Sequence, residues 1–168
     1  CKQRFHGTVQ CALGWACWKT YVGRPELTVR GEVDGIRISA MSSLANGLSD
    51  PEVGRYDEAL RVYEADLAYT KRHDADNFQA LLATRDNIAI CLAELGRNEE
   101  ALALHRDIFA ETIDHFGTED IETLEAAHSF AFALVENGDH AECLQFFIDY
   151  HLLDLAMEHY GAEHNYML

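Results

Sequence analysis

A block of seven residues returns along this chain at a fixed interval, and this repetition constrains the fold more than any other feature. Gly54–Leu60 (GRYDEAL) recurs as Gly96–Leu102 (GRNEEAL) and, more loosely, as Gly138–Leu144 (GDHAECL), with an interval of 42 residues each time. Intervals of this size are typical of arrays in which each supersecondary unit stacks on its neighbours. The 168 residues therefore predict an array of similar units.

Helical patterns lie on both sides of the repeated glycines. Before Gly96, apolar residues return every three or four positions from Leu81 to Leu95, and the same spacing continues after it from Ala101 to Phe116. We expect the glycine to end the first helix in left-handed backbone, and the acidic residues after it to favour the first turn of the next helix. The chain is thus predicted to be all-α and built of helical hairpins.

Small residues at matched positions predict close packing between helices. Ala59, Ala101 and Cys143 each stand five residues after a repeated glycine, where paired helices would approach each other. Because Cys143 replaces an alanine there, we expect a buried, inert thiol rather than a reactive or metal-bound one. The predicted repeat-packing residues are Gly54, Ala59, Gly96, Ala101, Gly138 and Cys143.

These features resemble the tetratricopeptide repeats of kinesin light chains and their relatives. The resemblance rests on the 42-residue period, the GRxxEAL block, the triplet Asn87–Ala89, and the loops Phe116–Glu119 and Tyr160–Glu163. It covers about residues 36–168 and implies a helical-hairpin solenoid, a right-handed superhelix of about two and a half repeats, of a class that binds other proteins. The heptad coiled coil of kinesin light chains is absent, so we interpret the chain as a fragment of another protein of this type.

The predicted organisation is an N-terminal helical extension over residues 1–32 and a solenoid over residues 33–168. The predicted repeats span about 33–75, 76–118 and 119–161, with the start of a further repeat at 162–168. Within the extension, Cys11–Val22 is apolar nearly all around, which predicts a short helix buried against the first repeat. The segment 27–38 fits a hairpin or a helix, and we favour a helix from about residue 33.

The last repeat departs from the earlier ones. A second pair of landmarks, Gly117 and Gly161, is 44 residues apart, so the second helix of this repeat is expected to be two residues longer. That helix is apolar over more than one face from Phe146 to Met157. Because the chain stops at Leu168, we expect further repeats, a second copy or a partner to cover this helix.

The charge is strongly acidic and unevenly placed. The chain has 13 Lys and Arg against 29 Asp and Glu, and after Arg106 it contains fourteen Asp and Glu but no Lys or Arg. Nucleic acids and anionic membranes require a basic face, so neither is expected as a partner. Five cysteines without a C-x-x-C pair favour reduced thiols and a cytoplasmic location.

Few residues suggest chemistry. His140–Glu142 matches half of the zinc deaminase signature, but its Pro-Cys-x-x-Cys half has no counterpart. His151, Asp154 and Glu158 could form an imidazole and carboxylate ridge on a helix, which we interpret as solvated side chains. We predict a protein that is not an enzyme, with no cofactor and no metal site.

In the fold that this chain resembles, the first helices of successive repeats line a concave groove. Alignment with the family gives the candidate peptide-binding residues Arg85, Asn87, Glu125, His128 and Ser129, together with Ser39, Ser42 and Ser43 of the first repeat. Asn87 matches the family asparagine that holds peptide backbone, and a plain helix-surface role is its equal alternative. We predict a protein-interaction module that binds a neutral or basic peptide or partner. The alternative is an oligomerisation segment that self-associates through its C-terminal helix.

Overall fold

The computed structural model describes residues 7–21, 32–152 and 154–155, and these residues hold seven helices and no strand. The prediction of an all-α chain is therefore confirmed. The chain divides into two compact units, residues 1–95 and residues 96–168, and each unit is described by itself.

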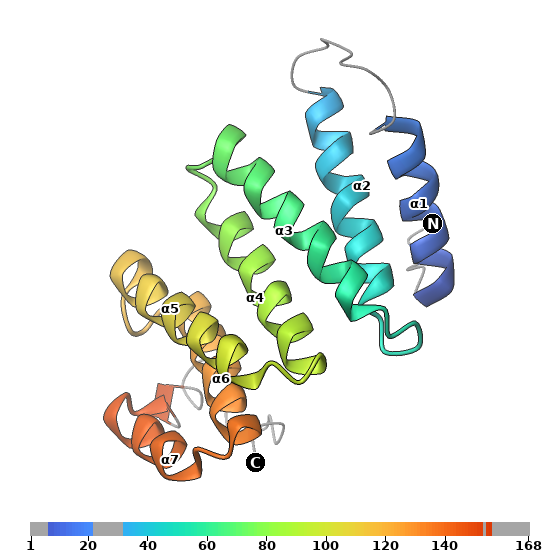
Figure 1. Ribbon diagram of the computed structural model, residues 1–168. Helices are drawn as coiled ribbons and strands as arrows, with labels where there is room; N and C mark the ends of the chain where they lie inside the picture. Colours follow the sequence, from blue (N-terminus) through green and yellow to red (C-terminus); the bar gives the residue numbers. More distant parts are fainter. Residues whose placement is uncertain (1–6, 22–31, 153, 156–168) are drawn as a thin grey trace. The chain divides into compact units, whose positions relative to one another are not determined.

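The first unit is a row of four helices (Figure 1). In it α1 (Gly7–Tyr21) packs against α2 (Glu32–Leu48), α2 packs against α3 (Tyr56–His73), and α3 packs against α4 (Phe78–Glu94). The start of α2 confirms the helix that was expected from about residue 33. Each helix therefore contacts the next one along the chain, as successive hairpins require.

Helices α1 and α2 approach each other closely at Gly14. A Cβ atom at Gly14 would lie 2.5 Å from the Cα atom of Leu44, whose side chain is 2% exposed. The opposite side of α1 is open, with Val9 51% and Leu13 47% exposed. The short helix expected here is therefore present and packs against α2, which covers one of its sides.

The second unit contains α5 (Asn98–Phe116), α6 (Ile121–Asn137) and α7 (His140–Asp149). Helix α5 packs against α6, and α6 packs against α7. Aromatic rings fill the space between the helices at edge-on and stacked distances, which suits their quadrupoles. The ring centroids of Phe109 and Phe130 are 6.0 Å apart, and Phe146 lies 5.0 Å from Phe109 and 4.9 Å from Phe130.

The repeated glycines occupy the turns between successive helices. Their φ angles are 62° at Gly54, 76° at Gly96 and 89° at Gly138. Residues with a side chain rarely adopt this left-handed region, so glycine makes these tight turns possible. Since a turn of this kind depends on a single residue, the repeated glycine dictates where one helix ends and the next begins.

The residue after the first two glycines is an arginine that pairs with a glutamate in the first helical turn. Arg97 Nη2 lies 2.6 Å from Glu100 Oε2, and Arg55 and Glu58 form the same pair one copy earlier. The third copy has no arginine at this position. Its glutamate, Glu142 on α7, instead pairs at 2.8 Å with an arginine of α5.

Helix α7 ends at Asp149, helical residues resume at Leu152, and the rest of the predicted last helix lies outside the described residues. The backbone of His151 has a φ of 50°, and a left-handed residue cannot continue a right-handed helix. The ring of Tyr150 lies 5.0 Å from that of Phe109 and 5.2 Å from that of Phe146. The chain therefore leaves the helix where this tyrosine joins the aromatic core.

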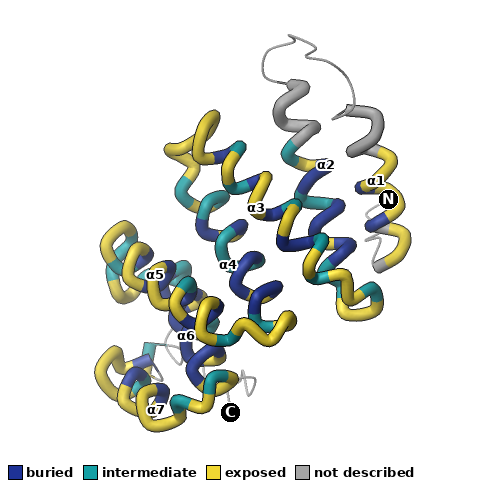
Figure 2. The backbone as a smooth tube through the Cα atoms, viewed as in Figure 1, coloured by how far each residue is buried: buried dark blue, intermediate teal, exposed yellow. Residues whose placement is uncertain are grey.

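Buried and exposed segments alternate along the helices, as Figure 2 shows most clearly for α3 and α5. This pattern is typical of helices with one packed side and one open side. None of the helices that the structure describes combines the length and the hydropathy that a bilayer crossing requires. Expectations about residues 27–31, Glu158, Gly161 and the further repeat at 162–168 lie outside the described residues.

Candidate functional site

The candidate site is the open side of α6, which is held firmly at both ends. At its start, Asp120 Oδ1 accepts the backbone N–H of Glu122 at 3.0 Å, and the Thr123 hydroxyl donates to the Gly117 carbonyl at 2.7 Å. At its end, Gly138 adopts the left-handed conformation that closes a helix. These caps satisfy backbone groups that a helix end leaves open, so the helix presents a fixed surface.

One side of α6 is packed and the other is exposed. The buried side carries Leu124, Ala127, Phe130, Ala131 and Leu134. The exposed side carries residues at steps of three, four and three, which place them in one row along a helix. We name this row the α6 ridge, and its members are Glu125, His128, Phe132 and Val135.

Two members of the α6 ridge are large apolar side chains in contact with solvent. Phe132 is 60% exposed and Val135 is 44% exposed. Glu125 and His128 continue the row toward the start of the helix, and both are exposed. Helix α6 carries three glutamates and no Lys or Arg. An apolar side chain with a positive charge nearby could therefore bind along this row.

The structure brings three of the predicted groove residues together on α6. Glu125 and His128 belong to the ridge, and the half-buried Ser129 lies four residues after Glu125, directly beside it. The prediction from the sequence missed Phe132 and Val135. The signal was present, because Phe132 stands 42 residues after Ile90, and both follow the small buried residue of their repeat.

On α4 the two predicted groove residues do not lie together. Arg85 and Asn87 are two positions apart, and residues at that spacing point to opposite sides of a helix. Asn87 shares its side with Ile90, which is 45% exposed. The Asn87 amide donates to the Ala83 carbonyl at 2.9 Å, so one of its two protons is held by its own helix.

In the first repeat, Ser42 faces the neighbouring helix. Its hydroxyl lies 3.0 Å from the Ile38 carbonyl oxygen and 3.3 Å from Asp66 Oδ2 on α3. Asp66 is 3% exposed, and burial raises the pKa of its carboxyl, although the hydrogen bond from Ser42 opposes the rise. Among the described residues, Asp66 Oδ1 has no hydrogen-bond partner. Ser42 is therefore engaged in packing between α2 and α3.

A second polar contact joins α2 and α3 nearby. The hydroxyl of Tyr63, a residue only 2% exposed, donates to Asn46 Oδ1 at 2.5 Å and lies 3.3 Å from the Ser49 hydroxyl. Burial raises the pKa of Tyr63 to about 12. The phenol therefore stays neutral at physiological pH and acts as a structural hydrogen-bond donor.

The small residues of the repeated block are buried at their helix contacts. Ala59 is fully buried, Ala101 is 1% exposed and Cys143 is 7% exposed. The Cys143 thiol lies 3.6 Å from the Ala131 carbonyl oxygen, and burial raises the pKa of this thiol. A thiol with a raised pKa forms little thiolate, so it is a poor nucleophile and a poor metal ligand at neutral pH.

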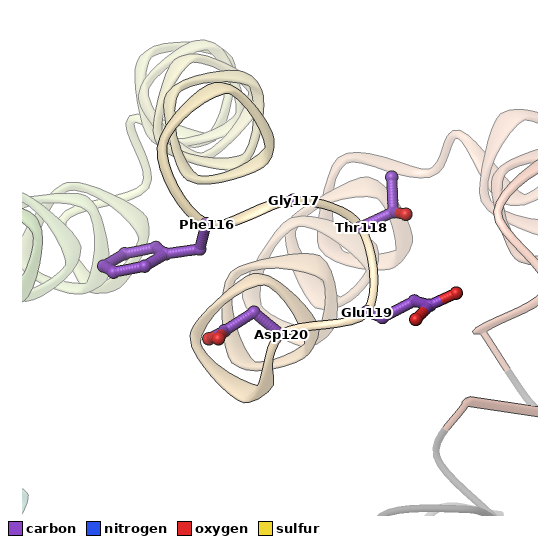
Figure 3. Close-up of a pocket in the computed structure, with 5 residues that line it drawn as sticks. All are labelled: Phe116, Gly117, Thr118, Glu119 and Asp120. Carbon is purple, nitrogen blue, oxygen red and sulfur yellow. The ribbon is translucent and has the colours of Figure 1, made fainter.

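The remaining polar clusters offer little for chemistry. A shallow hollow at the loop between α5 and α6 is lined by Phe116–Asp120, and Figure 3 shows the Phe116 ring and the Glu119 carboxylate on opposite sides of the loop. His151 Nδ1 lies 4.0 Å from Asp154 Oδ2, with both side chains mostly exposed. Within the described part of the chain, no three His, Cys, Asp or Glu side chains gather closely enough to hold a metal ion.

Comparison with known proteins agrees with this geometry. A family model described as a tetratricopeptide repeat matches residues 40–76, which run from the middle of α2 to the end of α3 and beyond. This part of the chain is a tetratricopeptide repeat. The resemblance inferred from the 42-residue period is thereby confirmed for the fold and for the type of repeat. A search of curated proteins found no match.

Two solved structures share the fold of this chain. Both are of the "Podosopora anserina putative kinesin light chain nearly identical TPR-like repeats", one of them a variant. Each has a TM-score of 0.63 and 19% sequence identity over 75% of this chain. The match covers 63% of the length of those structures. At 19% sequence identity, this similarity shows that the fold is shared and nothing more.

Proposed function

We propose that this tetratricopeptide-repeat protein is a non-catalytic interaction module whose partner lies along the open sides of the first helices of its repeats. Repeats of this kind are generally protein-binding modules. The observation that carries the proposal is Phe132, a phenylalanine that is 60% exposed on a helix whose other side is buried. A large exposed apolar side chain in a row of polar residues is the usual anchor of a protein interface.

The charge around the α6 ridge supports a neutral or basic partner. Glu125 is exposed within the ridge, and the sequence after Arg106 has no Lys or Arg. An acidic peptide would meet like charges there, whereas Lys or Arg of a basic peptide would pair with the carboxylates. On α4 the matching surface is formed by Asn87 and Ile90, so we propose that it binds the same class of peptide.

Two further properties belong to the same proposal. The described cysteines, Cys11, Cys91 and Cys143, are free and buried, which supports a reducing compartment such as the cytoplasm. Repeats of the matched family are typically non-catalytic, which supports a binding role without catalysis.

A peptide array sorted by charge tests the proposal. We expect the chain to retain neutral and basic peptides over acidic ones. We expect Phe132→Ser to lower the affinity for the selected peptides by about tenfold or more. Val9→Ser is the matched control, since Val9 is similarly exposed but lies on α1. Selection of acidic peptides, or equal binding by Phe132→Ser and the original chain, would contradict the proposal.

The α4 surface has its own matched pair of variants. Asn87→Ala should lower the affinity for the peptides that the array selects. Arg85→Ala should not lower it, because Arg85 lies on the other side of the same helix. If Arg85→Ala weakened binding and Asn87→Ala did not, the assignment of the α4 surface would be reversed.

A further inference from the structure

Helix α7 exposes a leucine at a position that the corresponding helix α5 keeps buried. The residues on α5 are Leu102, Arg106 and Phe109, which lie in one row at steps of four and three. Leu102 is 6% exposed and Phe109 is 5% exposed. Helix α6 packs on this row, because its Phe130 ring stacks on Phe109 at 6.0 Å and lies 5.6 Å from the guanidinium carbon of Arg106, which itself stays exposed.

The 42-residue repeat gives the counterparts of this row on α7. They are Leu144 and Ile148 on α7 and His151 just after its end, and we name these three residues the α7 end face. Leu144 is 65% exposed, although its counterparts Leu102 and Leu60 are only 6% and 7% exposed. The same residue type in the same repeat position is thus buried twice and exposed once. Helix α4 packs on α3 and α6 packs on α5, whereas the described residues contain no complete helix that follows α7.

Ile148 adds a second, independent observation. Its counterparts on α3 and α5 are the charged residues Glu64 and Arg106, both exposed. Ile148 is 56% exposed, so α7 carries an isoleucine at a position where the other copies meet solvent with a charge. The α7 end face is therefore both uncovered and more apolar than its counterparts, which indicates an interaction surface.

Charge decides between the possible occupants of this face. The exposed carboxylates Asp149 and Asp154 flank it, and the 62 residues after Arg106 contain no Lys or Arg. Two copies of the chain meeting at α7 would bring two anionic surfaces together, at a cost in repulsion. A helix with Lys or Arg beside its apolar row would gain favourable pairing instead.

We propose that the α7 end face binds an amphipathic helix of a partner protein, with small and aliphatic or aromatic residues in its contact row and basic residues beside that row. The partner helix would take the place that α6 takes on α5, with its largest side chain over Ile148. This surface is separate from the α6 ridge, so each can be lost without the other.

A synthetic helix tests the proposal. The probe is a labelled 17-residue peptide of the α6 sequence with its three glutamates replaced by lysine, and the matched control peptide keeps the glutamates. Fluorescence anisotropy should show that the lysine peptide binds at least about tenfold more tightly than the control peptide. Its affinity should also fall as the salt concentration rises, since exposed charges are screened.

Variants of the chain then locate the binding site. Ile148→Arg should keep the fold, because α5 carries arginine at this position. It should lower the affinity for the lysine peptide by about tenfold or more. Leu144→Gln should act in the same direction. Phe132→Ser, which removes the anchor of the α6 ridge, should leave binding of this peptide unchanged.

Three results would overturn the proposal. The first is that the lysine peptide does not bind. The second is that it binds the Ile148→Arg variant with the same affinity as the original chain. The third result concerns a second copy as the occupant: light scattering would find a dimer that Ile148→Arg converts to a monomer.

Discussion

Asp66 gives the sharpest test of the packing between α2 and α3. The Ser42 hydroxyl has one proton and two acceptors, the Ile38 carbonyl at 3.0 Å and Asp66 Oδ2 at 3.3 Å. If Ser42 donates to Ile38, an ionised Asp66 has no donor among the described residues, whereas a protonated Asp66 can donate to Ser42. Because Ser42 can donate to only one acceptor at a time, its hydrogen bond offsets only part of the burial, which raises the pKa of Asp66.

Replacing Asp66 by asparagine should stabilise the fold at pH 7. The asparagine amide can donate to Ser42 as the neutral acid does, so Asp66→Asn removes the charge and keeps the shape. A buried group without its hydrogen bond costs about 1–3 kcal/mol, and a charged one costs more. The cost of burying the charge has an upper limit, because the acid can bind a proton instead. Since pH 7 lies about 3 units above the ordinary pKa of 3.8 and each unit is worth about 1.4 kcal/mol, this limit is about 4 kcal/mol.

The gain should depend on pH with a defined sign. A carboxyl with a raised pKa in the folded state stabilises the fold below its ordinary pKa of 3.8 and loses that contribution as the pH rises through the raised value. The advantage of Asp66→Asn should thus be largest at pH 7 and vanish toward pH 4. Urea denaturation at a series of pH values measures it. The control is Glu64→Gln, which removes an exposed carboxylate from the same helix and should change stability by less than about 0.5 kcal/mol.

One outcome would refute this reasoning directly. If Asp66→Asn were no more stable than the original chain at pH 7, the buried carboxylate would have a favourable partner. A gain that stayed constant from pH 4 to pH 7 would show that the effect does not come from ionisation.

Three further perturbations test the packing and the turns. Gly14→Ala would place a Cβ 2.5 Å from the Leu44 backbone. It should therefore lower the free energy of unfolding by about 1–3 kcal/mol in urea denaturation and speed the proteolysis of α1. Unchanged proteolysis would argue against the close contact. Gly138→Ala has free space but a φ of 89°, so thermal unfolding should show a loss of about 1–2 kcal/mol from backbone strain alone. Burial raises the pKa of Cys91 to about 11, so this thiol should react with a disulfide reagent at pH 8 only after unfolding, and rapid reaction in the native chain would contradict its burial.

The helices and turns could be predicted from the sequence because they depend on local interactions. A glycine such as Gly96 ends a helix through its own backbone freedom, and the apolar spacing beside it determines which side of the next helix is buried. Three of the groove residues, Glu125, His128 and Ser129, could be placed on one helix side from their spacing alone. The end of α7 could not be foreseen, because it accompanies the packing of Tyr150 against aromatic rings on α5 and α7.

Exposure and ionisation were decided only by the tertiary structure. Leu102 and Leu144 occupy the same position of the repeat, yet a neighbouring helix covers one and leaves the other open. Asp66 reads as an ordinary acidic residue until α2 and α3 enclose it and remove it from water. The sequence by itself determined the repeat, the helical hairpins and the acidic charge, since these follow from residue type and spacing. The tertiary structure decided which side chains can meet a partner and which carboxyl has a raised pKa, because both depend on contacts between residues far apart in the chain.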